Sequence, residues 1–327
     1  MRPSGVSGVA IEEAADYPDL IEVDPTHYVL VREIARGGMG RIHIARDRRL
    51  GREVAIKEVL ISSESARRRF EREARITAGL QHPSIVSVHE AGRWPNGDPF
   101  YAMRLVTGRV LDEVVAEANT LAKRIALVPN VLAVADAMAY AHGQRVIHRD
   151  LKPSNIVVAG FGETVVLDWG LAKKLESDRT RVLRAATDVG DQPTTESVAG
   201  ETRLGDVLGT PAYMPPEQAA GTGVDERADV YAIGAILYHV LAGNPPYTAG
   251  SNAELIAALM TEPPEPLASR VPGVPEELVA IVERAMARNV AKRYPTAAEL
   301  ADDLRRFQTG QLVGAHRYSL RELLRRW

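Results

Sequence analysis

The architecture of this chain can be inferred from one segment, Val146-Ile147-His148-Arg149-Asp150-Leu151-Lys152-Pro153-Ser154-Asn155. A second motif, Asp168-Trp169-Gly170, follows at the end of an apolar run. Taken singly, either motif could arise by chance, and His148 alone would more often be a histidine of the core. The interpretation therefore depends on the order of the motifs and on the elements around them.

Residues 28–58 predict a small antiparallel sheet. Apolar side chains alternate with others at 42–44 and 54–57, with the period of two that half-buried strands show. Gly37-Gly38-Met39-Gly40 forms a glycine-rich bend between the first strands, and further strands are expected at 85–89 and 100–106. The bend alone is a weak indication of phosphate binding, because hairpin turns also favour glycine.

One helix, predicted from about Glu64 to Leu80, interrupts this sheet. Glu73 lies on the same side as its apolar stripe, which is costly for a carboxylate unless a cation meets it. Lys57 is mid-strand and could simply face solvent. If it pairs with Glu73, its other ammonium donors remain for phosphate oxygens.

The second half of the chain is predicted to be helical. Apolar residues recur with helical spacing at 111–118, 129–143, 276–287 and 297–307, and residues 228–241 are apolar all round, as in a helix through a core. We therefore expect an α+β chain with a disordered leader (1–24) and a two-lobed domain (25–309). The N-terminal lobe (25–106) would be an antiparallel sheet with one helix, the larger C-terminal lobe (107–309) helical, and the site would lie at their junction.

Length and composition narrow the class of protein. The 327 residues, 45% hydrophobic and 25% charged, fit an ordinary globular chain of about two units. The formal net charge of −3 gives no overall basic field that would attract nucleic acid or anionic lipid. The absence of cysteine excludes disulfides, thiolate nucleophiles and Cys-ligated zinc. The most apolar run, 230–241, is shorter than the roughly 18 residues of a membrane span.

The motifs occur in the order found in a known family. Val54-Ala55-Ile56-Lys57, the His148–Asn155 segment and Asp168-x-Gly170 resemble the signature of the eukaryotic-like protein kinases. Over roughly residues 28–307 the details resemble the bacterial serine/threonine branch, including His82-Pro83-Ser84-Ile85-Val86 and Gly209-Thr210-Pro211-Ala212-Tyr213-Met214-Pro215-Pro216-Glu217. The resemblance implies a two-lobed kinase fold that transfers the γ-phosphate of ATP to serine and threonine hydroxyls of proteins.

The same resemblance implies roles for individual residues. Asp150 would accept the proton of the substrate hydroxyl, and Lys152 would steady the γ-phosphate. Asn155 and Asp168 would bind Mg²⁺, with Mn²⁺ as an alternative. The residues expected to bind ATP are Ile34, Gly37, Gly38, Gly40, Ile42, Ala55, Lys57, Glu73, Met103, Arg104, Val106 and Val157.

Three residues resemble structural positions of the family, and two depart from its pattern. Asp229 would accept backbone N–H bonds from the His-Arg-Asp loop, and Glu217 would pair with Arg293. Ala35 replaces the first glycine of the G-x-G-x-x-G loop, and Trp169 stands where phenylalanine is usual. The bulkier indole could shift the balance between active and inactive positions of its loop.

The activation segment, 168–217, is longer than in most kinases. Residues 176–205 are polar and rich in Thr and Asp, which predicts an inserted or disordered stretch. Our hypothesis is that phosphorylation at Thr194, Thr195 or Thr202 regulates the enzyme, with phosphorylated Thr202 pairing with Arg149. The alternative is a tolerated surface insertion.

Residues 310–327 are predicted to form a basic amphipathic tail. This tail contains a capping-box pattern, Ser319-x-x-Glu322. The tail is either a juxtamembrane segment of a longer receptor-like kinase or a terminal helix docked on the helical lobe. We expect a cytoplasmic location, with membrane contact only through a region beyond this chain, and no nucleic-acid partner. Protein substrates, and the chain itself acting in trans as a dimer, are the expected partners.

A pseudokinase or scaffold that binds nucleotide without turnover is the alternative function. Pseudokinases usually lose the lysine, the catalytic aspartate or a metal ligand, whereas Lys57, Asp150, Asn155 and Asp168 are all present. A small-molecule kinase of the same fold is a third option, which the long activation segment disfavours.

Overall fold

The computed structural model describes residues 20–37, 40–60, 63–175 and 211–319. These residues divide into two compact units. Unit 1 contains the residues up to Arg68 together with His89–Met103, and unit 2 contains Arg69–Val88 and the residues from Arg104 onward.

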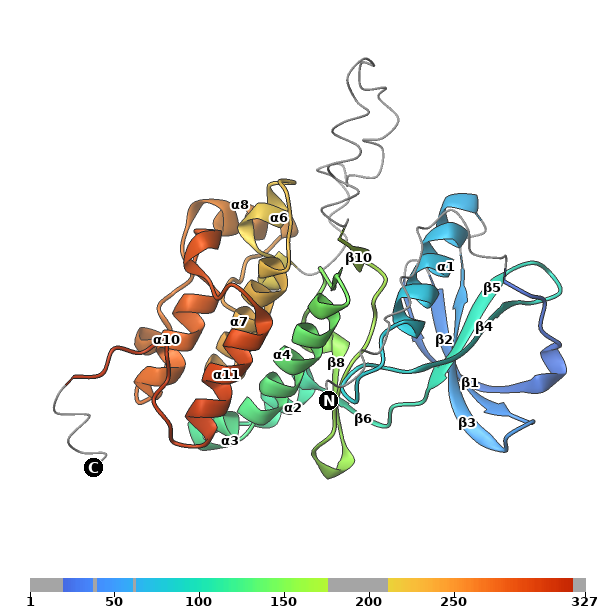
Figure 1. The fold of residues 1–327 in the computed structure, drawn as a ribbon, viewed down its shortest axis with the longest axis horizontal. Helices are drawn as coiled ribbons and strands as arrows, with labels where there is room; N and C mark the ends of the chain where they lie inside the picture. Colours follow the sequence, from blue (N-terminus) through green and yellow to red (C-terminus); the bar gives the residue numbers. More distant parts are fainter. Residues whose placement is uncertain (1–19, 38–39, 61–62, 176–210, 320–327) are drawn as a thin grey trace, which may run out of the picture. The chain divides into compact units, whose positions relative to one another are not determined.

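Unit 1 is built on a five-stranded sheet in the order β1-β2-β3-β5-β4 (Figure 1). The strands are β1 (Tyr28–Arg36), β2 (Gly40–Asp47), β3 (Arg52–Val59), β4 (Val88–Arg93) and β5 (Pro99–Arg104). The first three pair antiparallel as the alternating pattern predicts, and Gly51 closes the β2–β3 turn with a φ of 66°. The strand expected at 85–89 begins later than predicted, because Ile85 forms only an isolated bridge to Val166 and β4 begins at Val88.

Residues 21–23 add to the edge of this sheet beyond the predicted strands. Val23 N donates to the Arg93 carbonyl at 2.9 Å, and Arg93 N donates to the Ile21 carbonyl at 2.9 Å. Val23 is buried in the core of unit 1 against a glycine, Gly92, where an added Cβ would lie 2.5 Å from Val23 Cγ2. The end of the segment expected as a disordered leader is therefore part of the sheet.

Helix α1 (Glu64–Ala78) has nearly the predicted bounds. Ser63 precedes it and accepts a hydrogen bond from Ala66 N, as an N-cap serine does. Its apolar stripe is buried, and Thr77 at the end of the stripe donates its hydroxyl to the Glu73 carbonyl one turn earlier. The helix from Arg69 onward clusters with unit 2.

Unit 2 is mainly helical (Figure 1). Its helices are α2 (Leu111–Glu117), α3 (Leu121–Ile125), α4 (Val128–Gly143), α6 (Pro216–Ala219), α7 (Arg227–Ala242), α8 (Asn252–Thr261), α9 (Leu267–Arg270), α10 (Glu276–Ala285) and α11 (Ala297–Gln308). The short strands β6 (Gly108–Val110), β8 (Ile156–Ala159) and β9 (Thr164–Val166) form one small sheet, and β7 (Val146–Ile147) pairs with β10 (Lys173–Lys174).

Helix α7 forms the centre of unit 2, as its uniformly apolar sequence predicts. Every residue from Ala228 to Ala242 is buried, and the helix packs against α4, α10 and α11. Gly234 permits a close approach to α10, because an added Cβ would lie 2.6 Å from the Ala285 Cβ. Gly243 ends the helix with a φ of 76°, and Arg124 donates to the last carbonyls, at Leu241 and Ala242.

Within the described residues, the stretch Leu121–Gly143 has the length and composition of a membrane span. It comprises α3 and α4, and α4 packs against α7 and α11 with Val131, Val134 and Met138 buried. The apolar side chains of α4 are therefore buried in the core of unit 2.

The first part of the predicted tail is docked on unit 2. Asp303 of α11 is buried and accepts backbone N–H bonds from Gly314 at 2.7 Å and Ala315 at 2.9 Å. Tyr294 donates its hydroxyl to the same carboxylate at 2.9 Å, and Val313 beside it is buried. The amphipathic residues that follow Ser319 lie outside the described residues.

Candidate catalytic site

The loop after β7 is held by one buried carboxylate. Asp229, near the start of α7, accepts hydrogen bonds from His148 N at 2.8 Å and Arg149 N at 2.9 Å, which are the contacts expected of it. His142, at the end of α4, adds a third contact, with Nε2 at 2.8 Å from Asp229 Oδ2. Burial raises the pKa of this carboxyl, but the hydrogen bonds from His142 and from the backbone N–H of His148 outweigh it, so the pKa lies below its usual value.

Asp150 lies at the centre of three polar contacts. Lys152 Nζ is 2.8 Å from Asp150 Oδ2, and Asn155 Nδ2 donates to the Asp150 carbonyl at 2.9 Å. Asp150 N donates in turn to His148 Nδ1 at 3.2 Å. Burial raises the pKa of the Asp150 carboxyl, and the charge on Asp168 adds to this, while Lys152 acts in the opposite direction. A raised pKa of the carboxyl group makes its ionised form a stronger base, which is better suited to accept a proton.

His148 is fully buried. Because Nδ1 accepts from Asp150 N, the proton resides on Nε2, which lies 3.3 Å from the Leu167 carbonyl. The ring packs against Trp169 with centroids 4.6 Å apart. The indole of Trp169 is buried, and within the described part of the chain its Nε1–H has no hydrogen-bond partner. The indole ring is therefore well packed in this loop, but no polar group of the loop accepts a hydrogen bond from its N–H.

Asp168 occupies a strained backbone position. Its φ of 54° and the φ of 70° at Arg149 both lie in the left-handed region, which non-glycine residues seldom adopt away from functional sites. A Cβ added to Gly170 would lie 3.2 Å from Asp168 Oδ1 and 3.1 Å from Glu73 Oε2. The glycine therefore allows the loop to lie close to two carboxylates, one of them from α1.

The donor set of Asn155 and Asp168 fits a magnesium ion. Because Asn155 Nδ2 is engaged by the carbonyl of Asp150, its amide oxygen is directed away from that bond and can bind a cation. Together with the Asp168 carboxylate it offers the hard oxygen ligands that Mg²⁺ prefers. Within the described residues no cluster of three or more His, Asp or Glu side chains offers another metal site.

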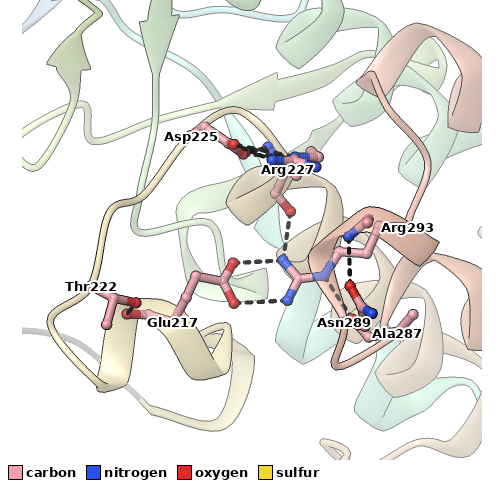
Figure 2. A network of polar contacts seen from close by, with 8 residues as sticks. Glu217, Thr222, Asp225, Arg227, Ala287, Asn289 and Arg293 are labelled. Carbon is pink, nitrogen blue, oxygen red and sulfur yellow. Dashed lines mark hydrogen bonds and ion pairs between the residues drawn. The ribbon is translucent and has the colours of Figure 1, made fainter.

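The end of the activation segment is joined to the late helices by an ion pair (Figure 2). Arg293 is fully buried and pairs with both carboxylate oxygens of Glu217, at 2.6 and 2.8 Å, as expected from the sequence. It also donates to the carbonyls of Arg227 and Ala287, so each of its three guanidinium nitrogens has a partner. Next to Glu217, Gln218 Nε2 donates to the Arg149 carbonyl at 2.8 Å.

The residues expected to bind the nucleotide belong to both units. In unit 1, Ala55 is buried and Lys57 lies in β3 opposite Ile42 of β2. Gly40 begins β2, where an added Cβ would lie 2.7 Å from the Glu58 carbonyl, so the close strand pairing requires glycine there. The others described in unit 1 are Ile34 in β1, Gly37 after it and Met103 in β5; Gly38 lies outside the described residues.

The other residues expected to bind ATP lie in unit 2. Val157 is buried in β8, opposite Val110. Val106 lies between β5 and β6. Arg104 N donates to the Ser87 carbonyl at 2.9 Å. The candidate phosphorylation sites Thr194, Thr195 and Thr202 lie outside the described residues.

Two polar contacts of the site are not apparent from the sequence. His142 gives no signal in its own stretch, because only folding brings the end of α4 to the start of α7. Gln218 follows the 209–217 motif directly, but its bond to the Arg149 carbonyl joins residues far apart in the chain. Side chains that hold a loop through its backbone leave no local pattern.

Comparison with known proteins places this geometry in context. A sequence model described as the protein kinase domain matches residues 28–304. The chain is 38% identical over 295 residues to the serine/threonine-protein kinase PknB of Mycolicibacterium smegmatis, and 37% identical over 298 residues to that of Mycobacterium tuberculosis. It is 34% identical over 294 residues to the probable serine/threonine-protein kinase PknB of Bifidobacterium longum.

These matches cover most of this chain but less than half of the relatives. The Mycolicibacterium and Mycobacterium alignments span 88% of the chain and 44% of the relatives' length. The Bifidobacterium alignment spans 86% of the chain and 40% of the relative.

Proposed function

The chain belongs to the protein kinase domain family, and we propose that it transfers the γ-phosphate of ATP to serine and threonine hydroxyls of proteins. The observation that carries the proposal is the contact of Asp150 with Lys152 and Asn155. These contacts combine a proton acceptor, a cation and an amide oxygen within one loop. Phosphoryl transfer needs this combination of positioning and charge neutralisation.

In this proposal Asp150 orients the substrate hydroxyl and accepts its proton. Its raised pKa follows from burial, and Lys152 at 2.8 Å keeps the carboxylate ionised for that task. Lys152 also faces the transferred phosphate, where its charge offsets that of the phosphate oxygens. The backbone of this loop is fixed by Asp229, so the base does not have to be ordered when substrate binds.

Asn155 and Asp168 would hold the metal, Mg²⁺ by preference and Mn²⁺ as an alternative. When bound, the ion neutralises phosphate charge and orients the β- and γ-phosphates. Lys57, Glu73 and the glycines of the β1–β2 loop would hold the remaining phosphates, and the apolar residues of β1, β2, β3 and β8 would enclose the adenine.

Activity can be tested with the purified chain, labelled ATP and Mg²⁺. We expect label on protein serine and threonine, and Asp150→Asn to lower the rate by about 10²–10⁴-fold, the contribution of a general base. Asp136→Asn is the matched control, since Asp136 forms an exposed ion pair with Arg305 away from the site. Nucleotide binding without turnover in the wild-type chain would instead indicate a pseudokinase.

Regulation through Arg149 is part of the proposal. Arg149 Nε is buried and has no hydrogen-bond partner among the residues that the structure describes, and Arg72 lies near enough to add to the positive field. Burial is the main cause of a lowered pKa for this guanidinium, which shows how little water screens its charge. The phosphate of a phosphorylated Thr202 would supply a negative charge to pair with Arg149 and Arg72. We expect Thr202→Ala to lower activity severalfold; undiminished activity and no phosphate on Thr194 or Thr195 would reject this switch.

The setting of the domain is likewise proposed. We propose a cytoplasmic setting, in which the chain is the kinase part of a longer, membrane-anchored protein; the chain spans less than half of the length of the relatives it matches. Protein substrates and a second copy acting in trans are the proposed partners. Concentration-dependent autophosphorylation, of an Asp150→Asn chain by wild-type protein, would test the trans reaction directly.

A further inference from the structure

Glu58 of β3 is a buried carboxylate that the proposed chemistry does not use. Its Oε2 accepts a hydrogen bond from Arg41 Nε at 2.9 Å, and its Oε1 accepts one from Trp94 Nε1 at 2.7 Å. The ring of His43 lies beside it, with Nδ1 3.4 Å from Oε2. Burying a carboxylate is costly unless donors meet it, so these bonds hold Glu58, Arg41 and Trp94 in one arrangement.

Arg41 lies at the base of the β1–β2 loop. It directly follows Gly40, whose carbonyl accepts from Gly37 N at 2.9 Å and closes the loop at its base. In the sheet, Arg41 lies opposite Arg36 of β1 on one side and opposite Glu58 of β3 on the other. The first side chain after the loop is therefore the one that Glu58 holds.

The two arginines at this base each have a carboxylate of their own. Arg36 donates two hydrogen bonds of 2.7 Å to Glu33 in the same strand, whereas Arg41 pairs with Glu58 across two strands. Like charges directly opposite each other weaken a strand pair. Removal of Glu58 would leave Arg41 facing Arg36 without its countercharge, at the point where β1 and β2 must stay together to close the loop.

Trp94 joins this arrangement to the core of unit 1. Its indole stacks on Phe100 with ring centroids 3.7 Å apart, and it packs edge-on against Tyr28. Both of these aromatic residues belong to the buried core beneath the sheet. Through Trp94, Glu58 and with it Arg41 are therefore fixed to a rigid part of the unit.

The other face of the same strands carries groups expected to bind the nucleotide. Side chains alternate along a strand, so Lys57 and its cross-strand partner Ile42 point to the face opposite Glu58. Gly40 connects the two faces, because it packs on the backbone of Glu58, where an added Cβ would lie 2.7 Å from the carbonyl oxygen. A shift of Arg41 would therefore move the glycines that are proposed to cover the phosphates.

We propose that Glu58 is a positioning residue for the triphosphate of ATP, which it serves by holding Arg41 and with it the base of the β1–β2 loop. This inference rests on the proposed kinase function and concerns the phosphates of the nucleotide, not its adenine and not the peptide. The side chain of Glu58 faces away from the nucleotide. Its effect is exerted through the backbone of Gly37 and Gly40.

The test compares the affinity of the purified chain for ATP with its affinity for adenosine, both measured by calorimetry with Mg²⁺ present. Adenosine has the same base and sugar but no phosphate, so a displaced loop should weaken only the binding of ATP. Glu58→Leu and Arg41→Leu remove the ion pair from either side, and their double variant completes the cycle. Trp94→Phe keeps an aromatic ring on the core but removes the N–H donor.

Two further variants serve as rescue and as matched control. Arg41→Lys keeps a cation next to Glu58. Arg52→Leu removes an arginine from the same pair of strands at its far end, where Arg52 lies opposite Asp47. The side chains of Arg52 and Arg41 are similarly exposed, at 41% and 38%, so the two leucine variants differ mainly in their distance from the loop.

We expect Glu58→Leu and Arg41→Leu to weaken ATP binding by about 3- to 10-fold, the range of one hydrogen bond, with adenosine binding unchanged. The double variant should be no worse than the more affected single variant. Trp94→Phe should change ATP binding in the same direction by a smaller factor, and Arg41→Lys should recover much of the loss seen in Arg41→Leu. Arg52→Leu should leave both affinities unchanged.

Two results would overturn the inference. One is an unchanged ATP affinity in Glu58→Leu and Arg41→Leu; the other is an equal loss of affinity for ATP and adenosine, which would indicate general loosening of unit 1. Wild-type protein that binds no ATP would contradict the proposed function and this inference with it, whereas binding without phosphoryl transfer would contradict only the proposed function. Thermal unfolding identifies a variant that fails to fold, and the more exposed Arg41→Leu then decides the outcome.

Discussion

At the scale of residues, Asp229 shows how one buried carboxylate can order a catalytic loop. Its two oxygens accept from His148 N, Arg149 N and His142. These bonds join the loop to the start of α7 and to the end of α4. A charge inside a protein is tolerable only when its hydrogen-bonding capacity is filled. Here backbone donors fill most of it, so the carboxylate stabilises the loop without competing with the catalytic groups.

Replacing this carboxylate should destabilise the protein and change its acid sensitivity. We expect Asp229→Asn to lower the free energy of unfolding at pH 7 by about 3 kcal/mol, the scale of hydrogen bonds to a charged group. The pKa of Asp229 is lowered in the folded state, so its contribution is present above the usual value of 3.8 and is lost as the pH falls further.

Urea unfolding of wild type and Asp229→Asn as a function of pH measures this directly. The difference between the two proteins should be constant from pH 7 to about 5 and should shrink below about 4. A difference that persists unchanged at pH 3 would mean that the ionised carboxylate is not what stabilises the loop.

At the scale of elements, the Glu217–Arg293 pair shows where a salt bridge is strong. Arg293 is fully buried and Glu217 accepts through both oxygens, so little water competes for either charge (Figure 2). Arg305 and Asp136 form a comparable pair between α11 and α4, but both are exposed. The same chemistry should therefore have different energetic weight in the two places.

A double-mutant cycle should separate the two pairs. Glu217→Gln leaves Arg293 buried without its countercharge and should cost about 3–5 kcal/mol, whereas Asp136→Asn should cost less than about 1 kcal/mol. Replacing both Glu217 and Arg293 by methionine should recover much of the loss, because no charge is then left buried. Equal costs for the buried and the exposed pair, measured by urea unfolding, would contradict this account.

The packing of α7 on α10 gives a second prediction for an element. Gly234→Ala should destabilise the protein by about 1–3 kcal/mol, because its Cβ would lie 2.6 Å from the Ala285 Cβ and the helices must move apart. Gly143→Ala is the control, since at the end of α4 an added Cβ meets nothing within 4 Å. That substitution should be neutral or stabilise slightly by helix propensity. A stabilising Gly234→Ala would show that the close approach is not required.

At the scale of the whole molecule, the folded units extend beyond the region that the family signature covers. The kinase match covers 28–304, but Val23 is buried in the core of unit 1 and residues 313–315 are bound by Asp303 in unit 2. Each unit therefore uses a flanking segment to complete itself. The boundaries 25–309 predicted from the sequence omit both segments.

Trimming the chain should reveal their contribution. A chain of residues 25–309 should be less stable than one of residues 20–319 by about 3 kcal/mol or more, from exposure of the cores beneath Val23 and Val313 and the loss of two N–H donors to a buried carboxylate. Thermal unfolding of the two chains measures the difference. Within the longer chain, Val23→Ala and Asp303→Asn should each account for part of it. Equal transition temperatures would show that the flanking segments are dispensable.

The sequence by itself determined the family, the two-lobed fold and the identity of the polar groups that carry the proposed chemistry. The evidence for this was local. It consisted of the period-two strands, the uniformly apolar α7 and the spacing of His148, Asp150 and Asn155, each of which can be recognised within a short stretch of consecutive residues. The helices near 64–80, 228–241 and 297–307 were predicted within a few residues for the same reason.

Only the tertiary structure decided which side chains meet across long stretches of chain. His142 and Asp229, Gln218 and Arg149, and Tyr213 and His239 come from elements that become neighbours when the helices pack. The same is true of Val23 at the sheet edge, of the isolated bridge at Ile85 in place of a strand, and of the tail held by Asp303. These contacts depend on the direction and distance of distant elements, which no period or short motif encodes.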